Sequence, residues 1–88
     1  MINGVKAMTN QKISNAQEEL LNIIMDITNR LCRDLDRNLI SEARRLYEIR
    51  SEKMDILSRI KTSDIVSLPN YPMFVACLHN FDDRFCRV

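Results

Sequence analysis

Two series of mostly apolar positions run in parallel from Leu20 to Cys32, each advancing by alternating steps of four and three residues. The first series is Leu20, Ile24, Ile27 and Leu31. The second, shifted by one position, is Leu21, Met25, Thr28 and Cys32. Such steps place side chains on one face of an α-helix, and a shift of one residue turns that face by about 100°. The pattern therefore predicts a helix that needs neighbours on two sides.

The second series allows two interpretations, which the pattern leaves open. In one, the helix is the middle member of a small bundle, and a third helix of the same chain covers the series. In the other, the series contacts a partner protein or a second copy, since exposed apolar patches commonly mark interfaces. We therefore treat Leu21, Met25 and Cys32 as candidate partner-binding residues.

The start of this helix is indicated at Ser14 or Asn15, which are followed three positions later by a Gln and a Glu. In such a capping box the two side chains satisfy exposed amides of the first helical turn. The preceding segment contains the only Gly of the chain and shows no periodic apolar pattern. We expect a flexible leader over residues 1–13 and a single domain over residues 14–88.

A break in the helix is expected within Asp36–Ile40. No Gly or Pro interrupts the segment, so one unbroken helix to about Lys61 is sterically allowed. However, the seven-residue apolar phase slips here, the side chains suit a turn, and Ser41 is a possible cap for a new helix. We favour the break, which gives a second helix over about residues 41–61, packed antiparallel to the first.

The second helix combines a charged face with an apolar one. Charges of both signs on one face are typical of a solvent-exposed surface. The apolar face carries Leu39, Ala43, Tyr47, Met54 and Leu57. Arg50 falls in the middle of it, where a guanidinium extends outward along its stem, pairs within the protein, or binds an anion of a ligand or partner. Arg50 and Tyr47 are therefore candidate binding residues.

Two prolines mark the end of the hairpin and the start of a final helix. Pro69 and Pro72 forbid a continuing helix and push the residues before them towards extended backbone. We expect a connector here that Ile65, Val66 and Leu68 attach to the core, with Pro72 in the first turn of a C-terminal helix. An apolar seam on that helix comprises Phe74, Leu78, Phe81, Phe85 and Val88.

These elements predict an all-α fold. The expected architecture is an antiparallel helical hairpin plus an amphipathic C-terminal helix, together a small three-helix bundle, with assembly into a helical oligomer as an option.

The C-terminal segment also holds the only His and two of the three cysteines, but not at useful spacings. Cys77 and Cys86 fall on opposite sides of a helix, and Cys77 and His79 are two positions apart. The spacing of zinc ligands is absent, and a single Gly excludes a glycine-rich phosphate loop. We expect no metal and no cofactor.

One further pairing is His79 with Asp83, four positions apart on the polar side of this helix. A surface ion pair is the favoured interpretation, because a catalytic dyad also needs a nucleophile or a substrate pocket. An enzyme using these two residues is the last-ranked alternative. Cys86 lies off the aromatic seam, where exposure would let oxidation link two copies.

Charge and composition reduce the number of function classes that fit the chain. Thirteen basic and twelve acidic residues leave a formal charge of +1, so no bulk field attracts nucleic acid. An alternative is binding of nucleic acid or an anionic small ligand through a local cluster, which interleaved glutamates disfavour. The cluster comprises Arg44, Arg45, Arg50 and Lys53. We expect no membrane insertion and no secretory signal, and an odd number of cysteines favours the cytoplasm.

The sequence therefore favours a helical interaction protein over an enzyme. We expect an adaptor, inhibitor or antagonist that binds a partner protein, or further copies of itself, through apolar helix faces. Its size would suit the small accessory proteins that phages and bacteria use against a host component. The candidate partner-binding residues are Leu21, Met25, Cys32, Tyr47, Arg50, Phe74, Phe81 and Phe85.

Overall fold

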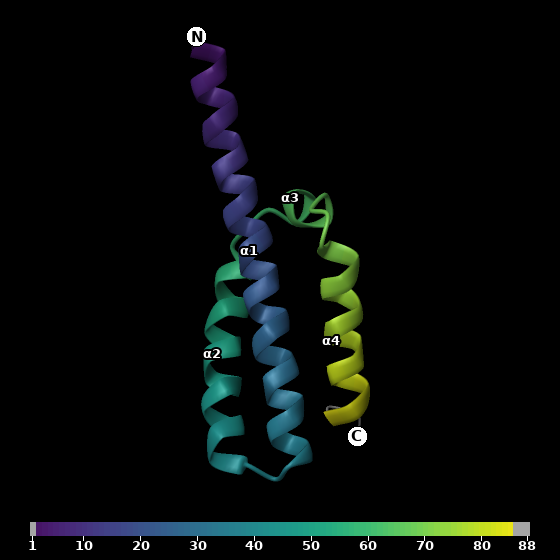
Figure 1. Cartoon of the computed structure of the whole chain (residues 1–88). Helices are drawn as coiled ribbons and strands as arrows, with labels where there is room; N and C mark the ends of the chain where they lie inside the picture. The colour runs from purple at the N-terminus through teal and green to yellow at the C-terminus, as the bar shows by residue number, and fades with distance from the viewer. Residues whose placement is uncertain (1, 86–88) are drawn as a thin grey trace.

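The chain forms helices throughout the part that the structure describes. This computed structural model describes the backbone of residues 2–85 and the side chains of residues 15–85. The helices are α1 (Ile2–Asp36), α2 (Ile40–Ser58), α3 (Thr62–Val66) and α4 (Tyr71–Phe85), as Figure 1 shows. Since no strand occurs within residues 2–85, the predicted all-α class is confirmed there.

The long helix α1 is the central element of the molecule. Both α2 and α4 pack against it, and in Figure 1 it lies between them. The chain direction reverses from α1 to α2, whereas α4 runs in the same direction as α1 (Figure 1). The short helix α3 closes one end, and the N-terminal part of α1 projects past that end (Figure 1). The molecule measures 55 × 21 × 18 Å.

Helix α1 starts much earlier than the capping pattern predicts. It begins at Ile2, so the predicted start at Ser14 or Asn15 is wrong. A capping box stabilises a helix end but does not by itself stop a helix, and residues 5–15 contain neither Gly nor Pro to do so. The division into a leader over 1–13 and a domain over 14–88 stays a prediction.

The predicted break after α1 is confirmed, and Asn38 shapes it. Asn38 has a φ of 61°, in the left-handed region that few residues other than Gly and Asn adopt readily. The amide of Leu39 donates to the carbonyl oxygen of Asp34 at 2.8 Å, and the amide of Asn38 donates to that of Leu35 at 3.2 Å. This pair of bonds is a Schellman motif, which satisfies carbonyl groups at the end of a helix.

Replacing Asn38 with Gly is expected to stabilise the protein. Gly adopts a positive φ without the steric conflict of a Cβ atom, so the free energy of unfolding should rise by about 0.5 to 1 kcal/mol. Asn38→Val should lower it by about 1 kcal/mol or more, because a β-branched residue disfavours this conformation. Urea unfolding of the three proteins gives the order. A Gly variant no more stable than the Val variant would contradict this account.

The start of α2 differs in detail from the prediction. The helix begins at Ile40, so Ser41 lies inside its first turn and the predicted cap at Ser41 is wrong. Leu39 occupies the capping position, and its side chain accepts no hydrogen bond. The turn at Asn38 therefore determines where α2 begins, because the helix starts only two residues after it. The helix also ends at Ser58, earlier than predicted.

The segment between α2 and α4 is tied to the core more firmly than a plain connector. It contains α3, which the sequence did not indicate, and the side chains of Ile65 and Leu68 are buried whereas Val66 is exposed. Asn70 Nδ2 donates at 2.9 Å both to the carbonyl oxygen of Glu18 and to Asn22 Oδ1 on α1. Pro72 lies in the first turn of α4, as predicted.

Two apolar clusters along α1 hold the helices together. The first comprises Leu21, Ile24, Ile65, Leu68 and Phe74. The second, towards the end of α1, comprises Leu31, Cys32, Ala43 and Phe81. Leu21 and Cys32 are thus buried within one chain, and Met25 packs beside the first cluster. Burial of Leu21 and Cys32 favours the interpretation in which the same chain covers this series, whereas Met25 is only partly buried.

Candidate partner-binding groove

An apolar groove lies beside the second cluster, with α2 and α4 as its walls and α1 as its floor. Its volume is about 420 Å³, and it is open to solvent on one side. Its lining residues are Leu31, Leu35, Ile40, Ala43, Arg44, Tyr47, Glu48, Phe81 and Phe85. Because α2 and α4 each pack on α1 and make few backbone contacts with one another, the space between them stays open.

The bottom of the groove is built from side chains of all three long helices. Leu31, Ala43 and Phe81 are buried, and Leu35 and Phe85 pack against them. The rings of Phe81 and Phe85 lie 5.5 Å apart, inclined by 47°. Both belong to the predicted aromatic seam of α4, so that seam forms core and groove together.

The rim of the groove carries two large exposed side chains from α2. Ile40 is 50% exposed and Tyr47 is 52% exposed, although both side chains line the groove. Arg44 and Glu48 stand beside them, also exposed. Exposure of apolar side chains of this size to water is unfavourable, and burial of them against another surface is favourable. Tyr47 is therefore one predicted binding residue that the structure leaves accessible.

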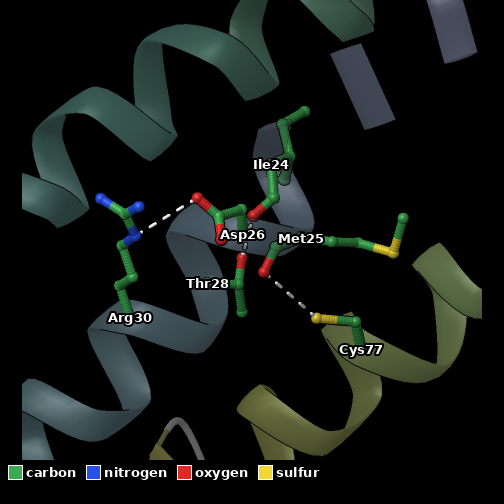
Figure 2. Close-up of polar contacts among 6 residues, drawn as sticks. All are labelled: Ile24, Met25, Asp26, Thr28, Arg30 and Cys77. Carbon is green, nitrogen blue, oxygen red and sulfur yellow. Dashed lines mark hydrogen bonds and ion pairs between the residues drawn. The ribbon is translucent and has the colours of Figure 1, made fainter. Parts of the chain in front are cut away.

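Arg50, another predicted binding residue, points into the protein instead of outward. Its Nε donates to Thr28 Oγ1 at 2.9 Å, and its guanidinium carbon lies 4.8 Å from the centre of the Phe81 ring. Thr28 Oγ1 in turn donates to the carbonyl oxygen of Ile24 at 2.7 Å, a contact drawn in Figure 2. A hydroxyl and an aromatic face of the same chain thus contact the guanidinium of Arg50, which is the pairing within the protein that the sequence allows.

The contact between Thr28 and Arg50 is expected to contribute to stability. Thr28→Val keeps the shape of the buried side chain but removes the acceptor, so the free energy of unfolding should fall by about 1 to 2 kcal/mol. Arg50→Met should cost a similar amount, and the double variant clearly less than the sum of the two. Urea unfolding of the four proteins measures this coupling. Strictly additive losses would show that the two side chains do not interact.

Two free thiols lie between α1 and α4. Cys32 is buried, and Cys77 Sγ lies 3.9 Å from the carbonyl oxygen of Met25, the contact shown in Figure 2, and 3.7 Å from Asn29 Oδ1. Burial raises the pKa of both thiols above the ordinary value of 9.0. In Cys77 the neighbouring Cys32 adds to this rise in pKa, since two thiolates would repel each other. Neither thiol is therefore activated as a nucleophile.

Both thiols should react slowly with iodoacetamide at pH 8. A Cys86→Ser variant reports on Cys32 and Cys77 alone, and its alkylation at pH 8 should be at least about tenfold slower when folded than in urea, since the thiolate is the reactive form. Because folding raises both pKa values, the stability that the thiols contribute is complete below pH 9.0 and is lost as pH rises through the folded values. Equal alkylation rates with and without urea would refute the burial argument.

The structure does not bring together the side chains of the remaining predicted catalytic or metal sites. His79 and Asp83 are exposed on α4, but no ion pair joins them among residues 15–85, so the predicted surface ion pair is wrong. Among the side chains of residues 15–85, no group of three His, Cys, Asp or Glu residues is placed to hold a metal ion. Cys86, with its predicted role in linking copies, and Val88 lie outside the described residues.

The polar contact at the far end of α4 is structural. Arg84 Nη2 donates to both carboxylate oxygens of Asp36, at 2.7 and 2.8 Å, and its guanidinium carbon lies 4.9 Å from the centre of the Phe85 ring. The hydrogen bond to Asp36 and the charge of that carboxylate raise the pKa of Arg84. This bridge joins the end of α1 to the end of α4, close to the groove.

The predicted site residues thus divide between core and groove. Phe74 is buried in the first cluster, and Phe81 and Phe85 form part of the groove. In the predicted basic cluster, Arg44 lies on the groove rim, whereas Arg45 lies exposed outside its lining. Sequence reasoning missed Ile40 and Leu35 as groove residues. Their apolar character was visible, but nothing in the sequence showed that both would line an open groove.

Comparison of the chain with protein-family models, with curated proteins and with solved structures finds no match. The described helices include none with both the length and the apolar character that crossing a membrane requires. The groove and its surroundings are therefore the features of the chain that bear on its function.

Proposed function

We propose that this chain is a helical interaction protein that binds a protein helix in the groove between α2 and α4. The observation that carries the proposal is the open apolar groove, whose rim residues Ile40 and Tyr47 are each about half exposed. A three-helix bundle of α1, α2 and α4 would present this surface, and a fourth helix would complete it. Amphipathic helices commonly bind in such grooves through apolar residues spaced by three and four positions.

The chemistry of the lining favours a helix over a small molecule. Small-molecule sites enclose their ligand and direct several polar groups towards it. This groove is open along one side, and its bottom consists of Leu31, Leu35, Ala43, Phe81 and Phe85. Polar groups occur only at the rim, which is the usual arrangement of an interface with an apolar centre.

The proposal includes no catalytic step and no bound cofactor, and it assigns the protein to the cytoplasm. His79 and Asp83 lie away from the groove lining, and the cysteines do not suggest an oxidised scaffold. Binding would act by occlusion or by holding the partner in place, as an adaptor or an inhibitor does.

Affinity capture with matched variants tests this proposal. The groove variant Ile40→Lys/Tyr47→Lys changes two exposed rim residues, and the control Ile56→Lys/Met73→Lys changes two exposed apolar residues outside the lining. Each tagged protein is incubated with a lysate of the source cells that also contains an untagged copy of the chain. Circular dichroism should show equal helicity in all three proteins.

We expect the wild type and the control to retain a protein that the groove variant loses. The retained protein is either an untagged copy of this chain or a different chain, and mass spectrometry identifies it. Recovery of the same proteins by all three forms, or an equal loss in both variants, would refute a binding role for the groove.

A further inference from the structure

The rim of the groove carries two opposite charges that find no partner within the described chain. Arg44 and Glu48 are one helical turn apart on α2, both are exposed, and both line the groove. The ion pairs among residues 15–85 join Arg30 to Asp26, Arg59 to Asp55 and Arg84 to Asp36. Arg44 and Glu48 take part in none of these pairs.

Tyr47 lies between these two charges in the sequence of α2 and is 52% exposed. The rim therefore presents a positive, an aromatic and a negative group in that order along one helix. Tyr and Arg are enriched among the residues that dominate binding at protein interfaces. A surface that fits this rim must offer an acidic group, an apolar contact and a basic group in matching order.

We infer that the occupant of the groove is a second copy of this chain, paired through an antiparallel contact of α2 with α2. In a twofold arrangement with its axis midway between Arg44 and Glu48, reversal of the helix direction exchanges the order of the two charges. Arg44 of each copy then faces Glu48 of the other, so one contact is made twice. Twofold interfaces are of this self-complementary kind.

This inference rests on the groove interface proposed above and names its occupant. Ile40 and Tyr47 would lose their exposure to water in the dimer, because each α2 lies over the groove of the other copy. An unrelated helix would need an acid and a base at the two matching positions, whereas a second copy supplies both. The carboxylate of Glu48, beside Arg44, would repel the phosphates of a nucleic acid.

Charge reversal and mixing test the pairing on the full chain. Sedimentation velocity over a concentration series should show a dimer for the wild type. Arg44→Glu places like charges at both contacts, and Glu48→Arg does the same with the opposite sign. Each change should weaken the dimer at least about tenfold, since two attractive contacts become repulsive.

An equimolar mixture of Arg44→Glu and Glu48→Arg should restore the dimer. In the mixed pair every contact joins opposite charges, and no contact within a single chain reproduces that effect. The matched control is Arg45→Glu, which makes the same charge change on the adjacent residue outside the groove lining and should dimerise like the wild type. Mixing also controls for folding, because a misfolded variant is not rescued by another one.

Several results would overturn the inference. These are a wild type that stays monomeric at all concentrations, a mixture that stays as weak as its components, and an Arg45→Glu variant that dissociates as readily as Arg44→Glu. If the chain is monomeric while the Ile40→Lys/Tyr47→Lys variant still loses a captured protein, the groove binds a different chain. In that case the dimer fails and the proposed function stands.

Discussion

Leu21→Ala is expected to lower the free energy of unfolding by about 3 to 5 kcal/mol. Leu21 lies on α1 and is completely buried. The other members of the first cluster lie on α1, in the segment around α3 and at the start of α4. Removal of its side chain loses apolar burial and leaves a cavity that rigid neighbouring helices fill only in part. A domain of this size is stabilised by roughly 5 to 10 kcal/mol, so the loss is a large fraction of the total.

Urea unfolding followed by circular dichroism measures this effect. The matched control is Ile23→Ala, which truncates an exposed aliphatic side chain two positions away on the same helix and should change stability by less than about 1 kcal/mol. Similar midpoints for the two variants would mean that α4 and the segment before it do not cover Leu21. The interface interpretation of the second apolar series would then return.

Phe81→Ala is expected to have an effect of similar size, about 3 to 5 kcal/mol, at the other end of the molecule. Phe81 is 3% exposed and contributes to the second cluster. The guanidinium of Arg50 also lies over its ring, so truncation removes packing and a cation–π contact together. The same urea experiment gives the loss.

Two further variants separate the contributions at this position. Phe81→Leu keeps most of the apolar volume and should lose clearly less stability than Phe81→Ala. Phe85→Ala truncates a half-buried ring at the groove and should cost less than Phe81→Ala, since solvent already reaches it. If Phe85→Ala proved the more damaging, Phe85 would belong to the core and the groove would be shallower than the structure indicates.

Local signals were enough for most of the helical pattern. The aromatic seam of α4 was visible from its spacing, and Phe74 and Phe81 are buried as that spacing implies. The break near Asn38 was visible from the turn-compatible residues and the slip in apolar phase. The start of α1 was not, because a capping pattern marks a favourable end without preventing an earlier one.

The candidate site was much less predictable. The sequence indicates Tyr47 and Arg50 together, yet Tyr47 is the accessible member of the pair, and Arg50 binds Thr28 from the preceding helix. That contact joins residues far apart in the chain, so periodicity along one helix carries no information about it. The same holds for Leu35 and Ile40, whose place in the groove depends on how α2 and α4 pack on α1.

The sequence by itself determined that the chain is helical, where it turns near Asn38, and which side of α4 is apolar. Each of these follows from interactions between residues a few positions apart. Only the tertiary structure decided that Leu21 and Cys32 are buried while Ile40 and Tyr47 stay exposed around a groove. The physical reason is that an apolar stripe shows which side chains favour burial but not which surface covers them. That surface depends on how the helices pack in three dimensions.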